Sequence, residues 1–215
     1  QITPSRVNAV LASYKSRVNC PRYMSLITAS LLNLSWMYRW RANGKGGTTS
    51  GTYYICATPQ ENNAISQMRS KLRDLSNAIH SSSNVLGTGS STNLASAECS
   101  FDYLFLDPPF GANLMYSELS FLWESWIKVL TNSGLEAIEN SYQGKTLDDY
   151  RVLMTQCFAE AYRVLKPGRW MTVEFSNTSA SVWNSIQSAL NEVGFVVANV
   201  AGLDKKQGSF KAVTT

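Results

Sequence analysis

Histidine and paired cysteines are scarce in this chain of 215 residues. It has one histidine, His80, and four cysteines, Cys20, Cys56, Cys99 and Cys157, which lie far apart and form no CxxC pair. A structural zinc site needs closely spaced Cys or His ligands, so the sequence predicts no bound metal. Scattered cysteines of this kind are typical of free, buried thiols in a reducing compartment.

Long apolar runs are also missing. No run approaches the roughly 20 apolar residues that a membrane-spanning helix requires, and the N-terminus lacks the charged-then-apolar pattern of a secretory signal. We therefore expect a cytoplasmic protein with no membrane partner. The chain starts at Gln1 rather than at a methionine, which raises the possibility that it is part of a longer polypeptide.

Charged residues are modest in number and nearly balanced in sign. They make up 16% of the chain, against 44% hydrophobic residues, which is typical of a globular protein with one substantial core. The net charge of +4 permits a polyanionic partner without requiring one.

Hydrophobic periodicity predicts an alternation of helices and strands. Apolar residues at helical spacing predict two helices within 5–40, broken near Cys20 and Pro21, and further helices within 62–80, 115–130, 147–165 and 182–190. Strands are predicted at 52–55, 85–86, 101–106, 170–175, 195–200 and, as an antiparallel neighbour of the last, 207–214. The pattern predicts an α/β fold with helices on both faces of the sheet. We divide it into a helical extension with a Gly-rich loop, 1–60, and an α/β domain, 61–215.

The most informative segment is Phe101–Gly111, which reads FDYLFLDPPFG. Because neither proline can donate to a sheet ladder, the strand must stop at Asp107, and the following carbonyls are left at the end of the sheet. The aromatic ring of Phe110 lies beside these acceptors. A carboxylate, a backbone carbonyl and a flat ring suit a planar group with an exocyclic amine, such as a nucleobase.

The block Asp107–Phe110 resembles the (D/N/S)-P-P-(Y/F/W) motif of the amino-group DNA methyltransferases. Ser100–Tyr103 before it and Leu165–Trp170 after it resemble the corresponding blocks of that family, and Gly111–Leu119 is similar to the longer bacterial methylases of the N6-adenine/N4-cytosine group. The resemblance extends over roughly 87–211. It implies a Rossmann-like, S-adenosylmethionine-dependent methyltransferase sheet.

The resemblance implies methylation of an exocyclic amine of a DNA base. Asp107 would accept one N–H of the amine, the carbonyl of Pro108 the other, and Phe110 would stack on the base. Pro109 is the remaining site residue of the motif. Positioning of the nitrogen lone pair would do most of the catalysis. Aspartate at the first motif position favours adenine N6, with cytosine N4 as the second possibility, and restriction–modification or phage defence is the usual setting of such enzymes.

The chain departs from the family at the cofactor site. The glycine-rich turn that follows the family's first strand is absent, and Gly44–Gly47 lacks the context of a buried strand. The resemblance places Gly89, Ser90 and Asp107 near the cofactor, but Ser90 stands where many relatives carry Asp. We therefore expect an incomplete domain that carries the base-binding half, with an open sheet edge covered by the N-terminal helices, a missing segment or a second chain.

Several basic residues are candidates for phosphate contacts in nucleic acid. They are Arg39, Arg41, Lys45, Lys205, Lys206 and Lys211. Glu174, at the end of a predicted strand, is a further candidate site residue. Two alternatives to DNA methylation stay open: methylation of a ribosomal RNA base, and a catalytically silent fragment that binds nucleic acid or acts as a scaffold.

Overall fold

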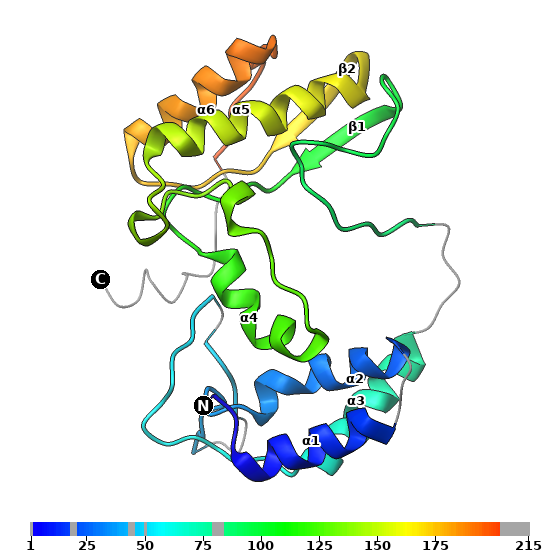
Figure 1. Ribbon diagram of the computed structural model, residues 1–215. Coiled ribbons are helices and arrows are strands. Elements are labelled where there is room, and N and C mark those ends of the chain that lie inside the picture. The colour runs from blue at the N-terminus through cyan, green and yellow to red at the C-terminus, as the bar shows by residue number, and fades with distance from the viewer. Residues whose placement is uncertain (1, 18–20, 43–45, 50, 79–83, 203–215) are drawn as a thin grey trace. The chain divides into compact units, whose positions relative to one another are not determined.

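The computed structural model describes residues 2–17, 21–42, 46–49, 51–78 and 84–202 (Figure 1). Its contacts group into two compact units, the first comprising Gln1–Thr88 and Gly111–Lys145, the second Gly89–Phe110 and Thr146–Thr215. This grouping differs from the division at residue 60 that we expected from the sequence. The reason is that the helix at 64–78 packs against the N-terminal helices.

The first unit is helical. Its elements are α1 (Ser5–Arg17), α2 (Pro21–Leu31), α3 (Ala64–Ala78) and α4 (Tyr116–Ile127), with short 3-10 helices η1 (Leu32–Leu34), η2 (Ser133–Leu135) and η3 (Ser141–Gln143). Each long helix places an apolar stripe on a common core, as the 3.6-residue periodicity predicts. That core includes Val7, Leu11, Leu26, Ile27, Leu31, Met68 and Leu122.

The second unit contains a strand–helix–strand motif and a further helix. Its elements are β1 (Phe101–Leu106), α5 (Leu147–Val164), β2 (Leu165–Val173) and α6 (Ala180–Val193). The two strands pair in parallel, and α5 and α6 pack side by side on one face of the pair (Figure 1). The α5 helix begins with a capping box, in which Thr146 and Asp149 satisfy each other's backbone N–H groups. The predicted α/β class is therefore confirmed, with helices and a parallel sheet among the described residues.

The pairing of β1 with β2 contains a bulge. Phe101 pairs with Leu165, but Tyr103 pairs with Trp170, so residues 166–169 loop out of the ladder. Asp102 accepts ion pairs from Lys166 at 2.9 Å and Arg169 at 3.3 Å, and its hydrogen bond to Lys166 lowers the pKa of its carboxyl. Beyond the bulge the register is regular, and Leu106 pairs with Val173 at the ends of the two strands.

The face of the sheet opposite α5 and α6 is aromatic. Alternate residues of a strand share a face, and Phe101, Tyr103, Phe105 and the paired Trp170 are 41%, 53%, 59% and 67% exposed. No described helix of the second unit covers them. Within this unit, helices therefore lie on one face of the sheet rather than on both.

Three of the predicted strands do not form in the described residues. Residues 52–55, 85–86 and 195–200 have no ladder partner. Tyr53 is instead held by its side chain, whose hydroxyl donates to the carbonyl of Leu119 and accepts from the N–H of Leu122. Val85 and Val196 are 94% and 87% exposed. The predicted strand at 207–214 lies outside the described residues.

Gly194 allows a test of how α6 ends. It has φ of 107° and follows the last helical residue, where its N–H donates back to the carbonyl of Asn191. A Cβ here would meet only ordinary contacts with Tyr162, so Gly194→Ala should destabilise the fold by about 1–2 kcal/mol through backbone strain alone. Urea unfolding measures this change.

Gly87→Ala is the control, because a Cβ at Gly87 would meet no atom within 4 Å and Gly87 has no positive φ. It should change the free energy of unfolding by less than about 0.5 kcal/mol. Equal effects of the two substitutions would contradict the strain argument.

Candidate functional site

The candidate site begins where β1 ends. The N–H of Glu174 donates to the carbonyl of Leu106 at 2.8 Å, which is the last ladder bond before the two prolines. Asp107 follows with its side chain exposed, and Pro108 is buried. Among the described residues, neither the Asp107 carboxylate nor the Pro108 carbonyl has a hydrogen-bond partner. Two adjacent acceptors are thus left available at the end of the strand.

The next two carbonyls are both occupied by side-chain donors. The hydroxyl of Tyr150, on the first turn of α5, donates to the carbonyl of Pro109 at 2.7 Å. The Nδ2 of Asn177, in the loop after β2, donates to the carbonyl of Phe110 at 2.8 Å. Of the three carbonyls from Pro108 to Phe110, only the first is free of such a bond.

The ring of Phe110 is held by other aromatic rings. It is half-buried and makes an edge-to-face contact with Phe175, with the ring centroids 5.3 Å apart and the planes at 82°. Phe175 makes a similar contact with Trp183, at 4.9 Å and 85°. The indole Nε1 of Trp183 donates to the carbonyl of Asn177 at 2.8 Å. Edge-to-face geometry is favoured by the quadrupoles of the rings, so this arrangement orients the Phe110 ring.

Glu174 lies at the same edge of the sheet as Asp107. It is half-buried and directly follows β2, as Asp107 directly follows β1, and the two strands end in register. The structure therefore places the backbone of Glu174 beside the end of β1, and a role for its carboxylate in the site stays a prediction. Among the described residues, no three Asp, Glu, His or Cys side chains form a cluster suited to a metal ion.

Gly89 and Ser90 belong to a segment that is attached near the C-terminal end of α5, whereas Tyr150 lies at its N-terminal end. The Ser90 hydroxyl bonds to Thr92 at 2.8 Å, and the Ser90 carbonyl accepts from Asn93 in a turn. The segment that follows is fixed by Glu160, which accepts from the N–H of Leu94.

Arg163 completes this attachment, because its guanidinium donates to the carbonyls of Leu94 and Ser96 and to Glu160. Glu160 and Tyr150 are ten residues apart on one helix, which corresponds to about 15 Å. No hydrogen bond or ion pair among the described residues joins Gly89 or Ser90 to Asp107, so their role at a cofactor stays a prediction.

Two of the predicted phosphate-binding residues lie in the described part of the first unit. The backbone of Arg39 bridges to Gly47 on one side and to Pro59 on the other. The Arg41 guanidinium lies against Gly47, where a Cβ would approach Nη2 to 3.3 Å. The remaining candidates, Lys45, Lys205, Lys206 and Lys211, lie outside the described residues.

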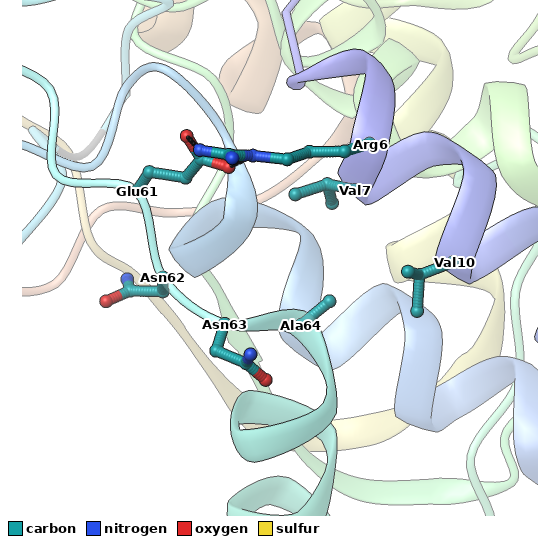
Figure 2. A pocket seen from close by; sticks show the side chains of 7 residues that line it. All are labelled: Arg6, Val7, Val10, Glu61, Asn62, Asn63 and Ala64. Atoms are coloured by element: carbon teal, nitrogen blue, oxygen red, sulfur yellow. Dashed lines mark hydrogen bonds and ion pairs between the residues drawn. The ribbon is translucent and has the colours of Figure 1, made fainter.

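A pocket of about 330 Å³ lies in the first unit, between α1 and the start of α3 (Figure 2). Arg6 and Glu61 form an ion pair at its edge. It is lined by Arg6, Val7, Val10, Glu61, Asn62, Asn63 and Ala64. None of the residues that the sequence singled out lines this pocket, and the Asp107 site belongs to the second unit.

Sequence reasoning missed the two donors that shape the site. Tyr150 lies in the helix predicted at 147–165 and was not singled out as a site residue, although a buried tyrosine hydroxyl usually requires a hydrogen-bond partner. Asn177 lies three residues beyond Glu174, and no sequence pattern relates it to Phe110.

The three cysteines in the described residues, Cys56, Cys99 and Cys157, are free thiols. Cys99 is exposed rather than buried as expected.

No described helix combines the length and apolar character that a membrane crossing requires.

In comparisons with known proteins, no family profile, no curated protein and no solved structure matches this chain. The resemblance to amino-group methyltransferases therefore depends on the quoted sequence blocks.

Tyr150→Phe tests the bond that holds Pro109. Tyr150 is fully buried, and removal of its hydroxyl leaves the Pro109 carbonyl without this donor. The substitution should lower the free energy of unfolding by about 1–3 kcal/mol, as measured by urea unfolding. Tyr142→Phe is the matched control, since Tyr142 is 100% exposed, and it should have an effect below about 0.5 kcal/mol.

The attachment of the Leu94 segment should depend on pH. Hydrogen bonds from Arg163 and from the N–H of Leu94 lower the pKa of Glu160 from 4.5 to about 2. A depressed folded-state pKa stabilises the fold above the unfolded-state value and is lost as pH falls through the folded one. Glu160→Gln should therefore be less stable than wild type at pH 6, and this difference should shrink between pH 4.5 and pH 2. A difference that stays constant over that range would contradict this assignment.

Proposed function

We propose that this chain carries the base-binding half of an S-adenosylmethionine-dependent methyltransferase that acts on an exocyclic amine of a DNA base. The supporting observation is a pair of acceptors with no hydrogen-bond partner in the described part of the chain, the Asp107 carboxylate and the Pro108 carbonyl, beside the oriented ring of Phe110. The carbonyls of Pro109 and Phe110 are already occupied. Adenine N6 is the favoured target and cytosine N4 the second.

The two acceptors would bind the two N–H groups of the amine. An amine with both hydrogens held in this way has its lone pair directed out of the plane of the base, which prepares the nitrogen for attack on an electrophilic methyl group. Asp107 acts here by orientation and by stabilising the positive charge that develops on the nitrogen. Phe110 stacks on the base and so positions the same nitrogen.

The target base must leave a duplex to reach these groups. Extrusion costs a few kcal/mol, and stacking of a base on an aromatic ring returns about 1–3 kcal/mol. Phe110 therefore offsets part of the cost. Arg39 and Arg41 are proposed phosphate contacts whose binding would weaken as salt concentration rises.

The cofactor would supply the methyl group, but the described residues do not form an evident place for it. The Ser90 hydroxyl is engaged by Thr92, and its segment is held at the far end of α5 from Tyr150. We propose that a further segment or a second chain completes the cofactor site and covers the open side of the sheet. A cytoplasmic location and a role in restriction–modification or phage defence belong to the same proposal.

The test is transfer of a labelled methyl group from S-adenosylmethionine to DNA by the natural full-length protein. Asp107→Ala should reduce transfer by about 100-fold or more, because one of the two amine acceptors is removed. Asp148→Ala is the matched control, since this exposed aspartate lies on the first turn of α5. It should leave transfer unchanged.

Three outcomes would change the proposal. Near-normal turnover of Asp107→Ala would show that Asp107 does not bind the amine. Transfer to ribosomal RNA with none to DNA would favour the RNA alternative. Calorimetric binding of S-adenosylmethionine to the 215-residue chain would contradict the proposal that the cofactor site is completed elsewhere.

A further inference from the structure

Asn177 connects three parts of the second unit. Its Nδ2 donates to the carbonyl of Phe110 at 2.8 Å, and its Oδ1 accepts from the N–H of Ser179 at 2.7 Å, just before α6. Its backbone carbonyl accepts from Nε1 of Trp183 at 2.8 Å. Asn177 thus bonds to the segment 107–110 after β1, which we call the acceptor loop. It also bonds to the start of α6 and to an aromatic side chain of α6.

The hydrogen bonds of Asn177 and a chain of aromatic contacts both lead to Phe110. Trp183 contacts Phe175, and Phe175 contacts Phe110 edge to face, while Asn177 holds the carbonyl of Phe110 itself. The backbone of Phe110 is therefore restrained by a hydrogen bond and its side chain by an aromatic contact. Both restraints come from the segment after β2.

We propose that Asn177 is a positioning residue, which orients Phe110 to stack on an extruded base. The inference rests on the proposed function and extends it by assigning this orientation to the side-chain amide of Asn177. Of its three hydrogen bonds, only the one from Nδ2 reaches residues 107–110. Its Oδ1 bond to Ser179 and its backbone bond to Trp183 support α6.

The two roles can be separated by substitution. Asn177→Asp keeps an oxygen for the N–H of Ser179 but has no donor for the Phe110 carbonyl. Asn177→Ser also keeps an acceptor near Ser179, carries no charge, and is too short to replace the amide. A loss shared by both variants is therefore due to the missing donor rather than to the added charge.

The experiment uses the full chain and a single-stranded oligonucleotide that carries 2-aminopurine at one position and fluorescein at its 5′ end. Stacking on an aromatic ring quenches 2-aminopurine fluorescence, while fluorescein anisotropy reports binding of the strand. At saturating protein, wild type should quench the probe and Phe110→Leu should not. Asn177→Asp and Asn177→Ser should each lose roughly half of the quenching or more, with anisotropy unchanged within about twofold.

Asn191→Asp is the matched control for charge, because Asn191 is exposed on α6. It should quench as wild type does. If Phe110→Leu quenches like wild type, base stacking at Phe110 is wrong and the proposed function fails with it. If Phe110→Leu loses quenching but both Asn177 variants retain it, the positioning role alone is wrong.

Discussion

Two successive residues without a backbone N–H group, Pro108 and Pro109, impose the constraint on which the candidate site depends. They prevent β1 from continuing its ladder with β2, which ends at the bond between Leu106 and Glu174. The chain therefore leaves the sheet with a carboxylate and successive carbonyls that no strand can pair. Backbone carbonyls outside a ladder are usually paired with other donors. Side chains from α5 and from the loop after β2 supply these donors at Pro109 and Phe110, and the acceptors of Asp107 and Pro108 remain.

The helix α5 holds two segments of the second unit, one at each of its ends. Tyr150 on its first turn holds the acceptor loop, and Glu160 and Arg163 near its last turn hold the segment around Leu94. Because a helix is stiff over this length, it keeps the two attachments apart. The Leu94 segment, which follows Ser90, is thus held at the end of α5 away from Tyr150, and the place of Ser90 at a cofactor stays a prediction of the resemblance to methyltransferases.

Sequence reasoning was most successful where structure is local. The helices were predicted because their apolar periodicity depends on neighbours three or four residues away, and β1 was predicted because it is an apolar run with a clear end. The strand predicted at 170–175 was only partly right, because β2 extends over Leu165–Val173. The strands at 52–55, 85–86 and 195–200 were wrong because a strand also requires a partner, which no local pattern supplies. The Asp107 motif was placed correctly at a strand end. Its donors Tyr150 and Asn177 are 41 and 67 residues away from the carbonyls they hold, and no periodicity relates residues at such distances.

The sheet itself contributes little rigidity to this site. Parallel sheets are normally covered on both faces, and two strands alone are marginal as a sheet. Here α5 and α6 lie on one face, and the other presents Tyr103, Phe105 and Trp170 with about half or more of each exposed. The precision of the acceptor loop must therefore come from its side-chain contacts, namely the Tyr150 hydroxyl, the Asn177 amide and the rings against Phe110. A chain or segment that covers the aromatic face would stiffen the strand that carries Asp107 without touching the base.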